Sequence, residues 1–448
     1  MGGASRMPGG HPAGRSEVEI WPRGRRKYLP AAAPPSASPA IDALIARTAI
    51  VIPTYWSRQY GLRRPGDSIE DHPTPTNQRG TIGRLLESLN GLADTPRVVL
   101  IVVSSSAPDV ETAAAYMADA VRDRCPYLPI ALWTPAHVQI LHGRMRATDH
   151  PEWIGWFDAR GYAQIRNMQL LVPDLLDCEL VVAVDDDEVV EDPYFLRRAA
   201  ASVVDGASDG GRVYGAASYY LDEQGFRMHE APLASLADPN PLERKTALMN
   251  GALQRIEALP GAVVPSVFAL GGNMTFHRDL LRRVGFDPAI TRGEDIDYVI
   301  NARLLGLPYH FDKNRPIRHL PPPGRSYRDF DYSKLQQDVR RFLYEREKLR
   351  AAAGDPTFAP LAAADLEPYP GALLTPELER HAVRSLTQHR PALYDTTFLE
   401  PGPFVEQAVA AACAGAQAFL GFARQWPDAL ETLREDRGLR HVARSILP

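Results

Sequence analysis

The chain has 448 residues, of which 45% are hydrophobic, so it can bury a sizeable core and its length allows two or three domains. It carries 50 Lys and Arg against 55 Asp and Glu, and the lack of a basic excess argues against a nucleic-acid-binding protein. Its three cysteines, Cys125, Cys178 and Cys413, are too widely spaced to indicate a disulfide framework or a cysteine metal site. We therefore expect a reducing, cytoplasmic setting.

The first 40 residues are rich in Gly, Pro, Ala, Ser and Arg and lack the apolar stretch of a secretory signal, which predicts a disordered tail. The basic cluster at residues 23–27 has no apolar anchor, so its attraction to an anionic membrane would be weak. Residues 408–423 are the stretch that most resembles a membrane span, but they are too few and too Ala-rich. We expect a packed helix there and no transmembrane segment.

Short β-branched runs alternate with amphipathic segments from about residue 49 onward. Helical spacing of apolar residues is found in three segments, 82–89, 165–175 and 296–304. Near-continuous apolar strands separated by helices are typical of a mostly parallel sheet that is covered on both faces. The predicted strands cover residues 49–53, 97–104, 129–134, 179–184, 213–221, 267–276 and 308–312.

The strand pattern disappears after residue 324, and Ala, Leu, Glu and Arg follow in helical patterns. We therefore predict a tail at residues 1–40, an α/β domain at 41–330 and a helical extension at 331–448. Two long loops, 57–80 and 222–265, interrupt the α/β region, and loops of this length commonly form lids or binding loops. A helical piece is expected at 245–259 within the second loop.

Three consecutive aspartates, Asp185, Asp186 and Asp187, follow the predicted strand 179–184. Open α/β sheets bind ligands at the carboxyl ends of their strands, which is where these residues fall. Adjacent carboxylates repel one another unless a cation neutralises them, and oxygen ligands suit Mg²⁺ or Mn²⁺ together with substrate phosphates. The run therefore predicts a site for a metal and a diphosphate.

A plainer alternative exists for the same run. It would form a solvated turn, in which Asp186 or Asp192 caps the next helix and Pro193 takes the first helical position. The aspartates by themselves do not decide between the two interpretations.

The order of five motifs resembles the GT-A-fold glycosyltransferases, specifically glycosyltransferase family 2 and its relatives. The resemblance covers about residues 48–320 and implies a Rossmann-like, mostly parallel sheet flanked by helices. It also implies transfer of a sugar from a nucleoside diphosphate donor to an acceptor hydroxyl. The motifs are IVIPTYW (50–56), GYAQIRN (161–167), LVVAVDDDEVVEDPYFL (180–196), LGGNMTFHRDLLRRVGFDP (270–288) and RGEDIDYVINARLLG (292–306).

The resemblance assigns the aspartate run to a donor and a metal ion, Mn²⁺ or Mg²⁺. Asp185 and Asp186 would approach the donor ribose, and Asp187 would bind the metal, with Asp185 and His319 as further candidate ligands. His319 precedes three prolines, and a late histidine completes the metal shell in several GT-A enzymes. A lone histidine is more often structural, so this assignment has a plain alternative.

Further residues are assigned to the donor by the same resemblance. Pro53, Thr54 and Tyr55 match the nucleotide-base pocket, and Arg166 matches a basic residue near the donor, although a surface arginine would look the same. The family usually places an acidic base-binding residue after the second strand, where this chain has serines at 104–106. The identity of the base therefore stays open.

Two Gly residues, Gly271 and Gly272, precede Asn273 in the fourth motif. Glycine suits a place where the backbone passes close to a ligand, and in the family this strand end lies beside the transferred sugar. A simple bulge or turn is the alternative for these three residues.

Glu294 and Asp295 are expected to open a helix, and carboxylates are favoured at a helix N-terminus for electrostatic reasons alone. In inverting family members an acid of this pair deprotonates the acceptor hydroxyl, and the resemblance points to Asp295. Asp297 should point elsewhere and form a pair or a cap. Retaining GT-A families carry similar elements, so retention is the main alternative to inversion.

Four basic residues follow the last predicted strand, and they either supply charge to a diphosphate or are merely solvated: Lys313, Arg315, Arg318 and Arg325.

Two other classes of protein compete with a glycosyltransferase. A sugar nucleotidyltransferase should carry a Gly-rich phosphate loop after the first strand, which IPTYWSRQYG lacks. A non-catalytic sugar-binding protein would not hydrolyse a donor. Self-association through the helical extension is a further expectation, and the acceptor is expected to be a small molecule or a glycan.

Overall fold

The structure is a computed structural model, which describes residues 38–59, 72–227, 236–322, 332–391 and 399–448, with residues 35, 64, 66–68, 70, 229 and 231 between them. The predicted disordered tail therefore lies almost wholly outside the described residues, as do its basic cluster and Arg325.

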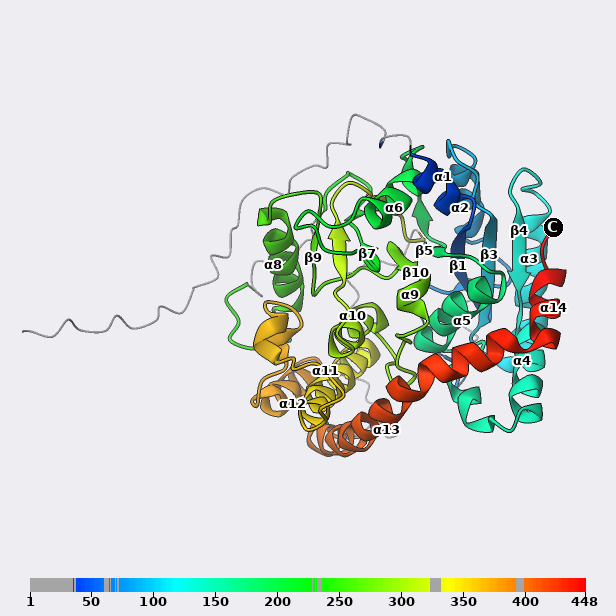
Figure 1. Cartoon of the computed structure of the whole chain (residues 1–448). Coiled ribbons are helices and arrows are strands. Elements are labelled where there is room, and N and C mark those ends of the chain that lie inside the picture. The colour runs from blue at the N-terminus through cyan, green and yellow to red at the C-terminus, as the bar shows by residue number, and fades with distance from the viewer. Residues whose placement is uncertain are drawn as a thin grey trace, which may run out of the picture.

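A nine-stranded sheet forms the centre of the molecule, with the strand order β4-β3-β1-β5-β10-β7-β11-β9 and with β2 paired to β1 outside this path (Figure 1). Strands β4, β3, β1 and β5 are parallel, whereas β10 runs antiparallel to both of its neighbours, β5 and β7. The strands are β1 (Thr48–Ser57), β2 (Thr74–Pro75), β3 (Val98–Ser105), β4 (Ile130–Trp133), β5 (Leu180–Ala183), β7 (Gly215–Ala217), β9 (Val263–Pro265), β10 (Met274–His277) and β11 (His310–Asp312).

A second, three-stranded sheet lies beside the end of β5. Its order is β6-β12-β8, and its strands are β6 (Glu188–Val189), β8 (Tyr220–Leu221) and β12 (Ile317–His319). Strand β12 pairs antiparallel with β6 and parallel with β8.

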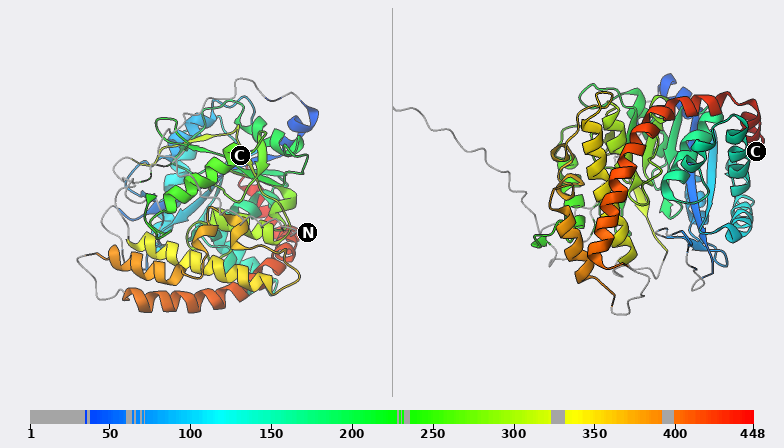
Figure 2. Two further views of the ribbon diagram at one scale, coloured as in Figure 1. Left: turned by 90° about the vertical axis from the view of Figure 1, so that its left-hand side faces the viewer. Right: turned by 90° about the horizontal axis from the view of Figure 1, so that it is seen from below.

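Helices cover both faces of the main sheet (Figures 1 and 2). Those of the α/β region are α1 (Pro39–Ile45), α2 (Ile82–Leu89), α3 (Glu111–Arg122), α4 (Pro135–Ala147), α5 (Tyr162–Leu175), α6 (Phe195–Val204), α8 (Lys245–Ala258), α9 (Arg278–Leu281) and α10 (Glu294–Leu304). The later helices are α11 (Tyr332–Ala353), α12 (Leu378–Gln388), α13 (Pro401–Glu435) and α14 (Arg437–Ser445).

Alternate side chains of the central strands enter two different cores, because successive residues of a strand point to opposite faces. Val51 and Leu100 join the core that includes α5, α10 and the later helices. Ile50 and Ile101 join the core beneath α1, α2, α3 and α6. The predicted architecture, a mostly parallel sheet flanked by helices and followed by a helical segment, is confirmed.

The three predicted helical stripes are buried in α2, α5 and α10. Several predicted strands are shorter than expected, and two differ most: residues 213–221 divide into β7 and β8, and residues 267–276 become strand only from Met274 onward. The helix after the aspartate run begins at Phe195 rather than beside Pro193. Asp192 accepts a hydrogen bond from the Tyr194 N–H and pairs with Arg198, so it fixes the turn that leads into α6.

The later helices pack against the α/β core. Helix α13 lies along α11 and then crosses beneath the sheet toward α14, which lies beside α4 (Figures 1 and 2). Trp426 of α13 is fully buried, donates a hydrogen bond of 2.9 Å to the Leu281 carbonyl and stacks on Phe157 at 5.6 Å between ring centroids. Residues of both regions thus belong to one hydrophobic core.

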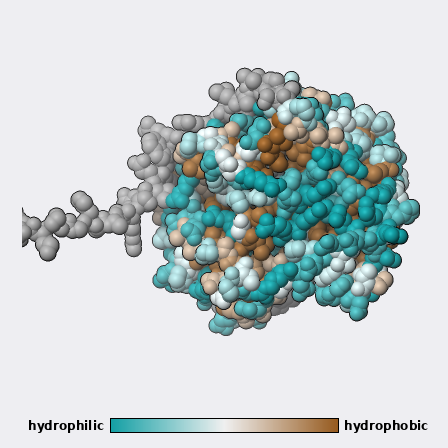
Figure 3. All heavy atoms as spheres, in the orientation of Figure 1, coloured by the Kyte–Doolittle hydropathy of each residue, from teal (hydrophilic) through white to brown (hydrophobic). Residues whose placement is uncertain are grey.

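Among the described residues, α13 alone is long and apolar enough to span a membrane, judged by length and composition only. A core helix passes the same test, and the packing of α13 on α11 agrees with the packed helix predicted for residues 408–423. The face drawn in Figure 3 carries mostly hydrophilic residues with separate hydrophobic areas and no continuous apolar band.

A buried cluster of charges joins α10 to α11. The Lys348 ammonium of α11 has no solvent exposure and lies 2.6 Å from Asp297 and 2.7 Å from Asp287. It also donates a 3.0 Å hydrogen bond to the Asn301 side chain. Burial raises the pKa of Asp297 to about 7, although Lys348 opposes this shift. Asp297 therefore forms a pair away from the neighbouring Asp295, as predicted.

Lys348→Met should destabilise the protein by about 3–5 kcal/mol, because it leaves two buried carboxylates without their shared cation. Urea unfolding followed by circular dichroism measures this change. Arg350→Met on the same helix is the control, since the Arg350 side chain is 56% exposed and its loss should cost within about 0.5 kcal/mol. Equal effects of the two substitutions would show that the Lys348 cluster does not hold α10 and α11 together.

Candidate functional site

The aspartate run lies at the carboxyl end of β5, next to the carboxyl end of β1. Strand β3 flanks β1 on one side and β5 flanks it on the other, so the strand order reverses at this point, where open α/β sheets bind ligands. The Thr54 hydroxyl of β1 donates a 2.8 Å hydrogen bond to Asp186 and closes the gap between the two strand ends.

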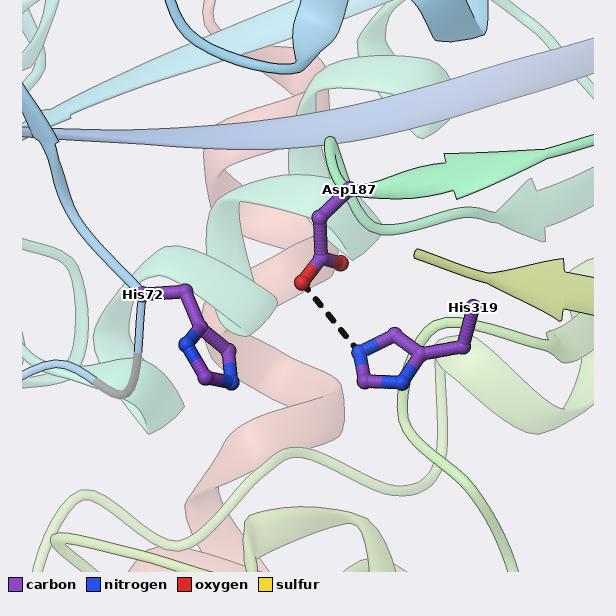
Figure 4. Close-up of side chains that lie close together, drawn as sticks. All are labelled: His72, Asp187 and His319. Atoms are coloured by element: carbon purple, nitrogen blue, oxygen red, sulfur yellow. Dashed lines mark hydrogen bonds and ion pairs between the residues drawn. The ribbon is translucent and has the colours of Figure 1, made fainter. Parts of the chain in front are cut away.

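The small sheet brings His319 to Asp187. His319 pairs in register with Glu188, the residue that follows Asp187, and the Leu320 N–H donates a 2.9 Å hydrogen bond to the Asp187 carbonyl. As a result the His319 Nε2 atom lies 3.2 Å from the Asp187 Oδ2 atom (Figure 4). Sequence analysis predicted both residues as metal ligands, and the structure places them side by side.

His72 is the third member of this group. Its ring points toward Asp187 and His319 (Figure 4), and one ligand atom from each of the three residues lies within 4.8 Å of the other two. We call these residues the His–Asp–His group. One carboxylate and two imidazoles at this spacing fit a divalent cation. Sequence analysis placed His72 within the long loop 57–80 but had no motif with which to single it out.

The charge state of Asp187 suits a metal ligand. Burial by itself would raise the pKa of this carboxyl, but the hydrogen bond from His319 and the charges of His319 and His72 outweigh burial and lower the pKa below its usual value. Asp186 has the opposite character, since burial and the neighbouring Asp187 raise its pKa well above the usual range. Adjacent residues of one run thus differ in charge.

Asp185, predicted as a candidate metal ligand beside Asp187 and His319, lies against Arg166 and is not a member of the His–Asp–His group. The Arg166 Nη1 atom is 2.9 Å from the Asp185 Oδ1 atom, and the Arg166 Nε atom is 3.1 Å from the Glu294 Oε1 atom. Arg166 is only 3% exposed, which rules out a surface arginine. One buried guanidinium therefore bridges the carboxyl end of β5 and the start of α10.

Glu294 shares Arg166 with Asp185 and lies next to Asp295 in the chain. Burial raises the pKa of Glu294 to about 7, with the charge of Arg166 opposing this shift and that of Asp295 adding to it. Tyr55 is nearby: its ring meets Tyr162 edge-on at 5.3 Å, and its hydroxyl is buried without a hydrogen-bond partner among the described residues. Pro53 is buried within β1, where it pairs in register with Val102.

The Gly271–Gly272 turn passes close to other side chains of the protein. A Cβ atom on Gly271 would lie 2.7 Å from the Arg166 Nη2 atom, and one on Gly272 would overlap Glu188. The Tyr220 hydroxyl accepts a hydrogen bond from the Gly272 N–H, and the Tyr220 ring stacks on His319 with 5.1 Å between centroids. Glycine suits both positions, because a side chain at either one would displace Arg166 or Glu188.

Asp295 lies on the far side of this turn and is partly buried. Its Oδ2 atom accepts a 3.0 Å hydrogen bond from the Gly271 N–H, and its Oδ1 atom accepts one of 2.8 Å from the Ile296 N–H. Burial raises the pKa of Asp295, while the charge of Arg341 on α11 opposes the shift. As predicted, Glu294 and Asp295 open the helix α10.

Several predicted site residues are engaged elsewhere. Asn273 is fully buried, and its side chain bonds the carbonyls of Tyr219 and Arg315 as well as the Arg315 guanidinium. Arg315 is buried in that contact, and Arg318 pairs with Glu191 at 2.6 Å. Asn273 and Arg315 therefore fix the turn after the Gly pair from inside the core.

Lys313 donates hydrogen bonds to backbone carbonyls at the end of α8, including that of Leu259. In the serine run at 104–106, Ser104 donates a 3.0 Å hydrogen bond to the Ala159 carbonyl. These two contacts join surrounding loops to the sheet, and neither involves the aspartate run.

No protein-family description and no curated protein sequence matches the chain. Among solved structures, it is similar to the mannosyltransferase PcManGT from Pyrobaculum calidifontis in complex with GDP-Man and Mn²⁺, with a TM-score of 0.37 and 16% identity over 89% of this chain and 86% of that chain. It is similar to a mycobacterial protein, with a TM-score of 0.36 and 17% identity over 68% of this chain and 78% of that one.

A third similar structure is GalNAc-T7 with UDP, GalNAc and Mn²⁺, with a TM-score of 0.39 and 12% identity. The alignment covers 84% of this chain and 57% of GalNAc-T7. Two of the three structures are thus glycosyltransferases with Mn²⁺, the class that the sequence motifs resemble.

Glu294→Gln tests the charge state of the acids around Arg166. The pKa of Glu294 is about 7 in the folded protein, whereas an ordinary glutamate has a pKa of 4.5. The folded state therefore binds this proton more tightly than the unfolded state does, and the parent protein loses stability as the pH rises from 4.5 to 7. Gln cannot lose a proton. The variant should therefore gain stability relative to the parent from pH 5 to pH 8, by on the order of 1–3 kcal/mol.

Thermal unfolding at pH 5, 6, 7 and 8 measures this trend. Glu431→Gln at an exposed position of α13 is the control and should follow the parent at each pH. A trend of the opposite sign for Glu294→Gln would mean that Arg166 outweighs burial and keeps Glu294 ionised.

Proposed function

We propose that this chain is a metal-dependent glycosyltransferase, which moves a sugar from a nucleoside diphosphate sugar to an acceptor hydroxyl. The observation that carries the proposal is the His–Asp–His group at the point where the strand order reverses, beside the acids bridged by Arg166. Motifs far apart in the chain converge at this edge of the sheet, in agreement with the resemblance to GT-A enzymes.

The donor side of the site is assigned to β1, the aspartate run after β5, the end of β12 and the loop before β2. Asp187, His319 and His72 would hold Mn²⁺ or Mg²⁺. A divalent ion, when bound, offsets the negative charge that builds on the departing diphosphate. Asp185 and Asp186 would position the donor ribose, and Pro53, Thr54 and Tyr55 of β1 would border the nucleotide base.

The acceptor side is assigned to Asp295 as general base, in an inverting single displacement. Two backbone N–H groups fix the Asp295 carboxylate, which restricts the direction from which an acceptor hydroxyl can approach. Burial raises its pKa, and a base accepts a proton more readily as its pKa approaches the working pH. Glu294 is tied to Arg166 and is better suited to positioning than to proton transfer.

Helices α8 and α11 would border the acceptor. Lys245 of α8 pairs with Asp338 of α11, which also lies 3.3 Å from Arg292 just before α10. This contact brings the helical piece of the second long loop and the start of the extension to the side of α10 that carries Asp295. We propose a small-molecule or glycan acceptor and a cytoplasmic setting.

Asp187→Ala should abolish metal-dependent donor binding, because it removes the one carboxylate of the His–Asp–His group. A thermal-shift screen of UDP-, GDP-, ADP- and dTDP-sugars with Mn²⁺ identifies the donor that stabilises the parent. At 100 times the dissociation constant such a donor adds about 2.7 kcal/mol. Asp428→Asn on the exposed face of α13 is the control. A variant with an undiminished shift would exclude Asp187 from the metal site.

Asp295→Asn should leave donor binding intact and lower the rate of transfer by about 10²–10⁴-fold, the usual contribution of a general base. Single-turnover transfer with the identified donor measures the rate, and NMR of the product gives the anomeric configuration. Inversion together with this loss supports a single displacement. A product that retains the donor configuration would refute Asp295 as the base of an inverting enzyme.

A further inference from the structure

The His–Asp–His group contains only one of the three adjacent carboxylates. Asp185 pairs with Arg166, and Asp186 accepts a hydrogen bond of 2.8 Å from the Thr54 hydroxyl. The remaining ligands are the two imidazole rings of His72 and His319. The aspartate run predicted an oxygen-rich site for Mg²⁺ or Mn²⁺, whereas in the His–Asp–His group nitrogen donors outnumber carboxylates.

This donor set determines which ions the centre can prefer. Mg²⁺ and Ca²⁺ are hard ions that favour oxygen ligands, and Mg²⁺ loses its water molecules reluctantly. Imidazole suits transition ions, whose affinity for a given site rises from Mn²⁺ to Co²⁺. We infer that this site selects a transition ion such as Mn²⁺ or Co²⁺ over Mg²⁺, and that His72 is the residue responsible. The role of the ion in sugar transfer rests on the proposed function, whereas its binding does not.

Both histidines lie beside paired strands, and the ring of His319 is also packed by a neighbour. His319 ends β12, which pairs with β6, and Tyr220 stacks on its ring with an interplanar angle of 19°. His72 lies two residues before β2, and Thr74 of β2 pairs in register with Trp56 of β1. The two rings are 6.3 Å apart between centroids. Because the β12–β6 pairing and the Tyr220 ring fix His319, this ligand has little conformational freedom to lose on binding.

His72 determines the metal selectivity because it supplies the second imidazole of the group. Asp187 and His319 come from the paired β6 and β12 region, and alone they would leave most of the coordination shell to water and phosphate oxygens, an environment that Mg²⁺ also accepts. The second imidazole replaces one of these oxygen ligands by nitrogen, which Mg²⁺ disfavours. Replacing His72 by a carboxylate should therefore restore tolerance of Mg²⁺ while the other two residues keep the site intact.

The test is a titration of the purified full chain with Mn²⁺, in which electron paramagnetic resonance measures the bound Mn²⁺. Mg²⁺ is then added as a competitor. The parent should bind one Mn²⁺ per chain, and a 100-fold excess of Mg²⁺ should displace less than half of it. His72→Asn should weaken Mn²⁺ binding at least 10-fold. His72→Asp should bind Mn²⁺ but lose it to Mg²⁺ at an excess at least 10-fold smaller than the parent requires. His441→Ala at an exposed position of α14 is the control and should match the parent.

Three results would overturn the inference: no Mn²⁺ bound by the parent, equal competition by Mg²⁺ in the parent and in His72→Asp, or unchanged Mn²⁺ affinity in His72→Asn. Circular dichroism of each variant verifies that the fold is kept. Since no donor or acceptor is present, the outcome is independent of the transferase assays. A chain that binds Mn²⁺ selectively yet transfers no sugar would refute the proposed function and leave the metal selectivity standing.

Discussion

Negative charge at the end of β5 is the constraint on which the site depends. Three aspartates follow one another there, and each has a different partner: Arg166 for Asp185, Thr54 for Asp186, and the histidines for Asp187. Each partner comes from a different part of the chain, so the folded sheet must assemble before the charges are compensated. The same constraint explains the Gly271–Gly272 turn, which leaves room for Arg166 and Glu188.

The sequence was sufficient to predict the sheet, its two covered faces and the helical segment after it, because long apolar strands and helical stripes are strong local signals. Asp187, His319 and Asp295 were selected through the family resemblance, and the structure places each of them around the same strand ends. Local patterns could not predict the small sheet, because β6 and β8 have only two residues each and show no periodicity. The pairing of β6 with β12 brings His319 to Asp187, so this proximity could not be predicted from local sequence patterns.

The other differences between the predicted and the observed site arise from contacts with residues that are distant in the sequence. Asp185 and Asp187 are adjacent to the same strand, and nothing in the run itself tells which of them meets Arg166. Asn273 lies in a ligand-binding motif of the family, yet here its amide is used by the buried Arg315. His72 carries no local signature, and the pairing of β2 with β1 brings its loop to the carboxyl end of the sheet beside Asp187.

The burial of Lys348 has a consequence for how separable the parts of this chain are. The carboxylates that it neutralises belong to the α/β region, one of them on the helix that Glu294 and Asp295 open, whereas the ammonium itself comes from the extension. A polypeptide shortened before α11 would keep the anions and lose their counter-ion. Likewise, a chimaera that takes its last helices from another protein of this fold would have to transplant the lysine and its two acids as one unit.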